Sequence, residues 1–153
     1  MTAENYTFAT LEQFVGQELG VSEWFQIDQQ RINDFADATG DHQWIHIDAE
    51  RAAASPMGTT IAHGYLTMSL LPLLMGEIGT MPSGVAHVLN YGADKLRFMN
   101  FVKVNQRVRN RAKLISAKPK SGGMLLKIEN TMEIEGEEKP AMVAETLSLA
   151  FPA

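Results

Sequence analysis

The second half of the chain alternates between apolar and polar residues, most regularly between residues 124 and 134. Apolar side chains there recur at every second position over most of the stretch, for example at Leu126, Ile128 and Met132. A period of two places such side chains on one face of a β-strand. Strands with similar composition are predicted at residues 86–91, 95–100, 106–117 and 141–151. Short links at 119–123 and 135–138 predict hairpins, and therefore an antiparallel sheet.

The first half predicts short helices separated by turns. Apolar residues at helical spacing indicate a helix over residues 11–15 and a second helix that Asp28 caps and Gly40 ends. Asp48 is placed to cap a third short helix. Residues 19–27, between the first two helices, have the composition of a strand.

A long helical segment from residue 61 to residue 78 is apolar on nearly all of its sides. A helix with apolar residues all round its axis is typically buried on every side. Pro72 interrupts this segment and should bend or loosen the helix, because proline has no backbone N–H to donate. These patterns predict an α+β fold in which an antiparallel sheet wraps around a long buried central helix.

Composition narrows the class of protein without identifying it. The 153 residues are 45% hydrophobic and predict one globular domain over residues 1–153. The absence of cysteine excludes disulfides, thiol nucleophiles and cysteine-ligated metals. A net charge of -5 argues against a nucleic-acid partner. The first 20 residues carry no lysine or arginine, and the most apolar stretch, 65–75, is too short to span a membrane. We therefore expect a cytoplasmic protein with no membrane association.

The loop after the second predicted helix carries a carboxylate and an imidazole five residues apart, Asp41 and His46. Such a pair can hold one water molecule and move protons in both directions, since histidine titrates near neutral pH. The alternative is structural: Asp41 caps a local turn, and His46 forms a hydrogen bond in the core. Composition alone favours this structural alternative.

The start of the long helix is a second candidate. Backbone N–H groups at a helix N-terminus are unpaired and lie at the positive end of the helix dipole, so they can stabilise an oxyanion. Gly64 would let a ligand approach this backbone closely. The alternative is packing, in which the glycine lets the helix pass close to the sheet.

Basic residues cluster between positions 94 and 113. Seven lie in this span: Lys95, Arg97, Lys103, Arg107, Arg109, Arg111 and Lys113. Arg107, Arg109 and Arg111 alternate with a period of two, which favours a solvated strand face. Lys95 and Arg97, close to Tyr91, are better candidates for contacting an anionic ligand such as a nucleotide phosphate.

A metal site at Asp41, His42 and His46 is a further possibility. Histidines four residues apart share one face of a helix. Gly40 argues against a helix at this point, and further ligands are not evident in the sequence. We expect no metal.

Three motifs, in this order along the chain, resemble one protein family. The motifs are Gly40-Asp41-xxxx-His46, Ile61-Ala62-His63-Gly64 and Lys95-Leu96-Arg97-Phe98. Together they resemble the MaoC-like dehydratases, also called (R)-specific enoyl-CoA hydratases. The run from Asp41 to His46 and the triplet Asn90-Tyr91-Gly92 are most similar to the nodulation protein N-like subgroup.

The resemblance implies a hot-dog fold, a homodimer and an acyl-CoA thioester substrate bound near the subunit interface. It implies that Asp41 and His46 form the catalytic pair, that the Gly64 N–H binds the thioester oxygen, and that no metal or redox cofactor is needed. Water would add to a trans-2-enoyl thioester to give an (R)-3-hydroxyacyl thioester. Candidate substrate contacts are Gln43, Trp44, His63, Tyr91, Lys95 and Arg97.

The sequence departs from the family pattern at one place, and three alternative functions are considered beside the hydratase. Many family members have Asn-Pro where this chain has Gln43-Trp44, and Trp44 is expected to pack rather than to shape the acyl tunnel. The alternative functions are dehydration of substrates on acyl carrier protein, thioester hydrolysis, and acyl binding without turnover. Because both catalytic candidates are present, we favour the hydratase.

Overall fold

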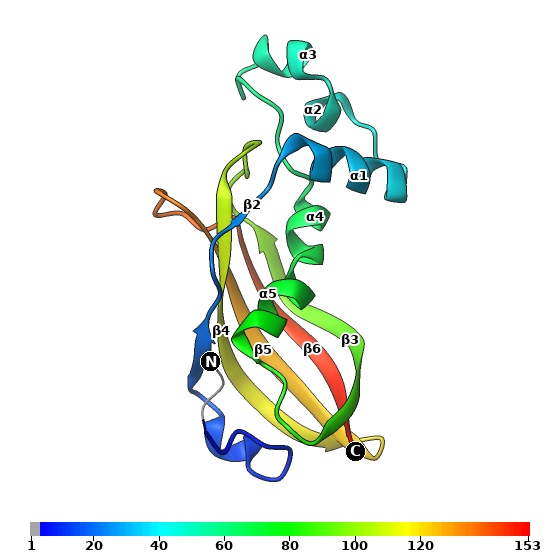
Figure 1. The fold of residues 1–153 in the computed structure, drawn as a ribbon, viewed down its shortest axis with the longest axis vertical. Helices are drawn as coiled ribbons and strands as arrows, with labels where there is room; N and C mark the ends of the chain where they lie inside the picture. The colour runs from blue at the N-terminus through cyan, green and yellow to red at the C-terminus, as the bar shows by residue number, and fades with distance from the viewer. Residues whose placement is uncertain (1–3) are drawn as a thin grey trace.

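A single antiparallel sheet forms the body of the structure, a computed structural model that describes residues 4–153. Residues 1–3 of the expected domain lie outside the described residues. The strand order is β1-β4-β5-β6-β3, and β2 pairs with the start of β4 (Figure 1). The strands are β1 (Glu18–Val21), β2 (Phe25–Gln26), β3 (Val85–Phe98), β4 (Arg107–Lys120), β5 (Gly123–Ile134) and β6 (Met142–Pro152).

The β4–β5 hairpin shows why neighbouring strands are antiparallel. Lys120 pairs with Gly123, so only Ser121 and Gly122 form the turn. Both turn residues have positive φ, 52° and 81°. Two successive left-handed residues make the turn whose twist matches that of the flanking strands. The predicted hairpin is confirmed.

The central helix is two shorter helices, α4 (Gly64–Ser69) and α5 (Leu71–Ile78), which lie against the sheet (Figure 1). The predicted start at residue 61 is wrong, because Ile61 forms a bridge with Lys103 instead. The predicted disturbance at Pro72 is confirmed: proline cannot donate to the carbonyl four residues earlier, and the break falls just before it.

Burial of the helix pair is one-sided. Leu66, Leu74 and Ile78 are buried, whereas Tyr65 is 66% and Leu73 is 46% exposed. The prediction of a helix buried on every side is therefore wrong for this chain. Its buried side packs with the inward-facing residues of β4, β5 and β6 in one apolar core. A sheet that curves around a central helix pair is the hot-dog arrangement, and the predicted α+β class is confirmed.

The remaining helices, α1 (Gln29–Thr39), α2 (Trp44–Ile47) and α3 (Ala49–Ala53), gather beyond one end of the sheet (Figure 1). The 3-10 helix η1 (Leu11–Phe14) lies near the chain start. Asp28 Oδ1 accepts a hydrogen bond from the Arg31 N–H at 2.9 Å and caps α1, and Gly40 ends it at φ 84°. Asp48 caps α3, as predicted.

Two strand predictions need correction. The segment 19–27 forms two short strands, β1 and β2, rather than one. Residues 86–91 and 95–100 are joined in the single strand β3, which accommodates an irregularity at Lys95, where φ is 50°. Because β3 pairs only with β6, it forms an edge of the described sheet, and most of its residues are exposed.

Within residues 4–153, no helix combines the length and the apolar character needed to cross a membrane.

Candidate active site

Three side chains that are separate in the sequence meet at the end of the sheet nearest α1–α3. Asp41 follows α1, His46 lies in the single turn α2, and His63 precedes α4. One donor atom from each lies within 4.8 Å of the others. His46 is 6% and His63 is 2% exposed, while Asp41 is exposed to solvent. The expected Asp41–His46 pair therefore comes together, with a second imidazole beside it.

His46 is held in one orientation by its surroundings. Its Nδ1 lies 2.7 Å from the Ile61 carbonyl oxygen, which can only accept, so Nδ1 carries the hydrogen. Gln29 Nε2 donates to the His46 carbonyl at 2.8 Å, and Thr60 Oγ1 donates to Gln29 Oε1 at 2.5 Å. In the neutral ring this leaves the Nε2 lone pair as the free acceptor.

The pKa of His46 is lowered from its ordinary value. Burial is the largest cause, because it disfavours the imidazolium ion, and the nearby His63 lowers the pKa further. The hydrogen bond to Ile61 and the negative charge of Asp41 oppose these effects without reversing them. His46 is therefore a neutral base at pH values near neutrality.

His63 contacts both members of the pair. Its Nε2 donates to the Asp41 main-chain carbonyl at 2.9 Å. Its ring stacks on the His46 ring, with centroids 3.8 Å apart and planes inclined by 22°, and Phe35 packs against it at 4.9 Å. His63 Nδ1 is buried and has no hydrogen-bond partner within the described residues.

Gly64 is the first residue of α4. The preceding carbonyl, that of His63, accepts the first helical hydrogen bond, from the Thr67 N–H at 3.2 Å. The Gly64 N–H therefore has no acceptor within the helix. A Cβ at this position would lie 3.2 Å from the Phe98 ring. A larger residue here would require a small shift of the Phe98 ring.

A cavity of about 240 Å³ adjoins His46 and Gly64. Its walls are mostly apolar and come from α2, the segment before α4 and the residues around the end of β3. The main apolar contributors are Ile45, Ile61, Phe98, Phe101 and Val102. An apolar cavity with a few converging polar groups is the usual form of a small-molecule site.

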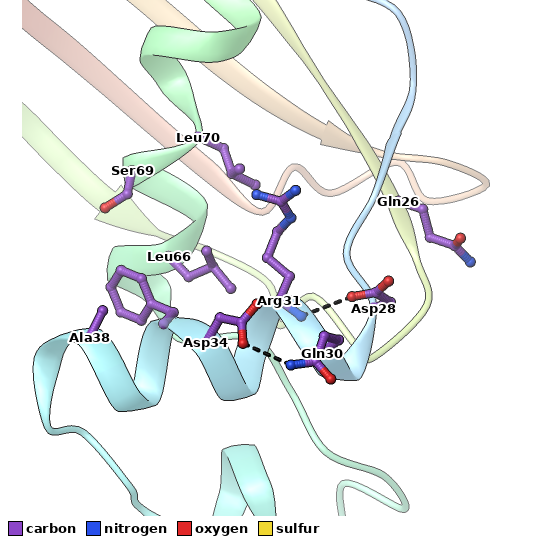
Figure 2. A pocket seen from close by; sticks show the side chains of 10 residues that line it. Gln26, Asp28, Gln30, Arg31, Asp34, Ala38, Leu66, Ser69 and Leu70 are labelled. Carbon is purple, nitrogen blue, oxygen red and sulfur yellow. Dashed lines mark hydrogen bonds between the residues drawn. The ribbon is translucent and has the colours of Figure 1, made fainter.

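A larger cavity, of about 510 Å³, lies between α1 and α4 (Figure 2). Arg31 reaches into it beside Leu70, with Asp28 and Asp34 along its floor. Its wall includes Phe35, the residue that packs against His63. None of the predicted site residues lines this cavity, so the candidate chemistry belongs to the smaller one.

The two residues that depart from the family pattern lie beside the cluster rather than in the cavity. The Gln43 N–H donates to Asp41 Oδ1 at 3.3 Å, and the Gln43 carbonyl accepts from the His46 N–H at 3.0 Å. Trp44 lies under the Arg51 guanidinium, 4.3 Å from ring centroid to carbon. Trp44 is half-buried and belongs neither to the apolar core nor to the cavity lining.

The predicted ligand contacts on β3 are not part of the cavity lining. Lys95 Nζ lies 3.4 Å from Glu145 Oε1. Arg97 donates to the Leu96 carbonyl at 2.7 Å, and the Tyr91 ring lies below the Lys120 ammonium. The structure therefore does not bring Tyr91, Lys95 or Arg97 together with the catalytic candidates in this chain.

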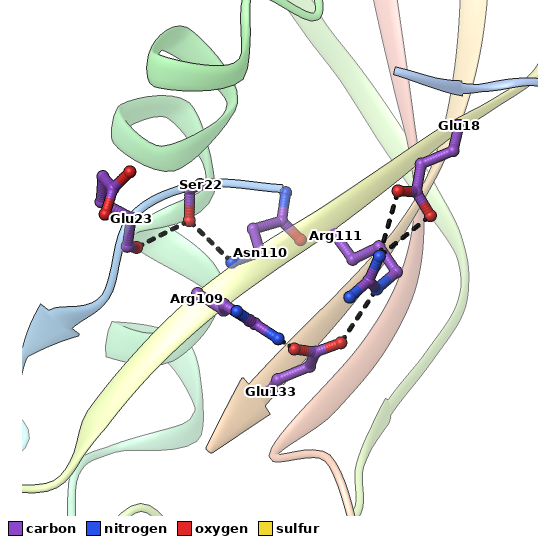
Figure 3. A network of polar contacts seen from close by, with 7 residues as sticks. All are labelled: Glu18, Ser22, Glu23, Arg109, Asn110, Arg111 and Glu133. Carbon is purple, nitrogen blue, oxygen red and sulfur yellow. Dashed lines mark hydrogen bonds and ion pairs between the residues drawn. The ribbon is translucent and has the colours of Figure 1, made fainter. Parts of the chain in front are cut away.

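The arginines of β4 pair with acidic residues. Glu133 accepts from Arg109 Nε at 2.6 Å and from Arg111 Nε at 2.9 Å, and Glu18 pairs with Arg111 at 3.0 Å (Figure 3). Burial alone would raise the pKa of Glu133, but the two arginines outweigh it and lower the pKa. Arg107 pairs with Glu135 in the same way. The strand-face interpretation of these arginines is confirmed.

The geometry is unfavourable for a metal ion. A metal lies in the plane of each imidazole that binds it. The rings of His46 and His63 instead stack with their planes inclined by 22°, so one ion could not lie in the plane of both rings. His42, the third ligand considered from the sequence, is exposed and lies 2.9 Å from Asp37 Oδ1.

Several site residues were not found by sequence reasoning. Gln29 and Thr60, which fix the His46 backbone, are common polar residues with no distinguishing pattern. Phe98 and Phe101 are large and apolar, but their exposure, 45% and 61%, is visible only in the structure.

Comparison with known proteins indicates one protein family. The family model described as "MaoC like domain" matches residues 10–135. A Mycobacterium tuberculosis protein named 3-hydroxyacyl-thioester dehydratase Z is 47% identical over 140 residues, covering 91% of this chain and 92% of the relative. Nodulation protein N of Rhizobium leguminosarum bv. viciae is 48% identical over 141 residues, covering 88% and 85%.

Solved structures share the fold. The R-hydratase PhaJ1 from Pseudomonas aeruginosa superposes with a TM-score of 0.76 at 23% identity, covering 97% of this chain and 88% of that one. An (R)-hydratase from A. caviae superposes with a TM-score of 0.72 at 21% identity, covering 88% and 94%. Because the sequence identities are below 25%, these superpositions show only that the fold is shared.

Proposed function

Because the chain belongs to the family of MaoC-like dehydratases, we propose that it catalyses the reversible hydration of trans-2-enoyl-CoA to (R)-3-hydroxyacyl-CoA. The observation that carries this proposal is that Asp41 and His46 come within 4.8 Å of each other, while His46 and Gly64 both line an apolar cavity. Membership of a dehydratase family supports a hydro-lyase activity. We propose in addition that CoA is the carrier and that Asp41, His46 and Gly64 act in the reaction.

In the proposed step, one water molecule lies between Asp41 and His46. The water oxygen attacks C3, the C2=C3 π bond breaks, and its electron pair moves towards C2 and the thioester oxygen. His46 Nε2 takes one proton from the water and passes it to C2, while the Asp41 carboxylate accepts a hydrogen bond from the second O–H, which stays on the oxygen as the 3-hydroxyl group. The lowered pKa of His46 supports its role as the base. The step as written uses neither a metal nor a redox cofactor.

The negative charge that develops on the thioester oxygen must be stabilised by a hydrogen-bond donor. The Gly64 N–H has no acceptor within α4 and adjoins the same cavity as His46. Removal of one such oxyanion donor typically costs about 2.7–4 kcal/mol in the transition state. The acyl chain would lie along the apolar walls of the cavity.

The test is the loss of enoyl-thioester absorbance on crotonyl-CoA and longer analogues. We expect activity in the wild-type protein and a fall of about 10²–10⁴-fold in kcat for both Asp41→Asn and His46→Gln, with little change in Tm. Wild-type activity retained in both variants would refute the assigned pair. Absence of activity on every enoyl thioester tested would refute the proposed function.

The same experiment separates the alternative enzymes. Matched CoA and acyl-carrier-protein thioesters distinguish the two carriers, because the chemistry is the same and only the rates differ. Release of a free thiol would indicate thioester hydrolysis instead. Tight binding of acyl-CoA without turnover at any chain length would indicate a binding module.

We further propose that the protein is a homodimer joined through β3. This strand is an edge of the described sheet, and it exposes Val88, Leu89 and Tyr91 by 37%, 52% and 51%. A long apolar edge strand is a template for pairing with another chain. β3 ends at Phe98, which lines the cavity, so a second copy paired there would lie next to the site.

Light scattering on the wild type and on Leu89→Lys tests the dimer. We expect the wild type to be dimeric and the variant to be mainly monomeric, because a lysine on an edge strand opposes pairing. Val15→Lys is the matched control, since Val15 is also exposed, at 42%, but lies outside β3. A monomeric wild type, or two variants that dissociate equally, would contradict the proposal.

A further inference from the structure

We propose that His63 is a positioning residue that sets the distance between the Asp41 carboxylate and the Nε2 of His46. The inference rests on the proposed function. It replaces the expectation that His63 contacts substrate. His63 is 2% exposed and is not among the residues that line the cavity beside His46.

The first support is the hydrogen bond to Asp41. Asp41 follows Gly40, the residue that ends α1, and no regular helix or strand contains it. The donation from His63 Nε2 to the Asp41 carbonyl, at 2.9 Å, ties this backbone to the start of α4. A Gln43 N–H then donates to the Asp41 carboxylate at 3.3 Å. The position of the carboxylate thus depends on a side chain that lies 22 residues away in the sequence.

The second support is the contact with His46. The two rings stack at 3.8 Å, and Phe35 packs on His63 at 4.9 Å. The His46 ring is fixed at Nδ1 by the Ile61 carbonyl and along its face by His63. One imidazole therefore contacts both members of the proposed catalytic pair.

The third support is the peptide link. His63 directly precedes Gly64, and its carbonyl accepts the first helical hydrogen bond of α4. The ring that positions Asp41 and His46 is consequently attached to the residue whose N–H would bind the thioester oxygen. Since a misplacement of about 1 Å can cost about 10²-fold in rate, one anchor common to all three groups has direct value for catalysis.

Two substitutions separate the functions of the ring. His63→Gln retains an Nε2 donor that reaches the Asp41 carbonyl but removes the stack. His63→Phe retains a ring against His46 and Phe35 but removes the donor. The assay is hydration of crotonyl-CoA, with kcat and KM determined separately and Tm measured for each variant.

We expect His63→Phe to lower kcat by about 10²-fold with KM changed less than about 3-fold, and His63→Gln to restore kcat to within about 5-fold of the wild type. Wild-type kcat in His63→Phe, or equal losses in both variants, would overturn the inference. If His63→Phe does not fold, His63→Leu replaces it, because it also removes the donor, and the same comparison of kcat with His63→Gln applies.

These outcomes are distinguishable from failure of the proposed function. An inactive wild type refutes the hydratase and the inference together. An active wild type that is abolished by Asp41→Asn, but retained in His63→Phe, refutes only the role of His63.

Discussion

Two polar clusters in this molecule look alike in the sequence and differ in the structure. The sheet cluster comprises Glu18, Arg109, Arg111 and Glu133, and the site cluster comprises Asp41, His46 and His63. In the sheet cluster each charge has an opposite charge within about 3 Å. In the site cluster, among the described residues, His46 and His63 each donate to a main-chain carbonyl and form no hydrogen bond with a carboxylate.

The difference teaches what distinguishes a reactive cluster from a structural one. The arginines and glutamates satisfy one another, so little of their hydrogen-bonding capacity is left for a ligand. His46 is held firmly at Nδ1 while its Nε2 lone pair stays free. A high density of charged residues is therefore no mark of a reactive site by itself, whereas an acceptor without a partner beside a cavity is available to a substrate.

Substitution of Gly64 is expected to have the largest effect on the activity of the site cluster. Gly64→Pro removes the N–H, and proline fits the first position of a helix. His63, at φ -58° and ψ 139°, already has the backbone that precedes proline. We expect kcat for enoyl-thioester hydration to fall by about 10²–10³-fold.

Gly64→Ala is the matched control, because it also presses a Cβ on Phe98 but retains the N–H. We expect kcat to fall much less in Gly64→Ala than in Gly64→Pro. Equal losses in the two variants would show that the glycine serves packing alone.

His46 gives the site cluster a pH dependence. Its pKa in the folded protein is below the ordinary value of 6.5, so the unfolded chain binds a proton more readily. Stability is therefore retained above about pH 6.5 and lost as the pH falls towards the folded-state pKa. We expect Tm to fall more steeply between about pH 7 and pH 5 in the wild type than in His46→Gln. Parallel Tm profiles would contradict this.

Glu133→Gln tests the sheet cluster. The folded-state pKa of Glu133 is lowered, so its stabilisation is present above the unfolded-state pKa and is lost as the pH falls through the folded-state value. We expect a loss of about 1 kcal/mol in the free energy of unfolding near neutral pH, measured by urea denaturation. The loss should shrink below about pH 5, while kcat stays unchanged. A large fall in kcat would show that the sheet cluster serves the reaction.

His42→Ala should give the smallest effect. His42 lies four residues before His46 but is exposed, and its pKa is raised by the hydrogen bond to Asp37. We expect kcat to change less than about 2-fold, because a surface pair of this kind contributes little. A fall in kcat comparable to that of His46→Gln would indicate that His42 takes part in the reaction and would contradict this assignment.

The sequence by itself determined the local elements. Alternation predicted β4, β5 and β6 closely, and capping residues such as Asp28 and Gly40 placed the ends of α1. The Asp41–His46 spacing also selected two of the three residues of the site cluster. These features are readable because periodicity, caps and turns act over a few neighbouring residues.

Only the tertiary structure decided which distant groups meet. The stacking of His63 on His46 joins residues 46 and 63, and the pairing of Glu18 with Arg111 joins residues 18 and 111. The 66% exposure of Tyr65, on a segment whose composition predicts burial on all sides, is likewise decided by the tertiary structure. Such contacts depend on how the sheet and helices pack, and no local pattern encodes that packing. The physical difference between a paired arginine and a free imidazole thus arises only after the chain has folded.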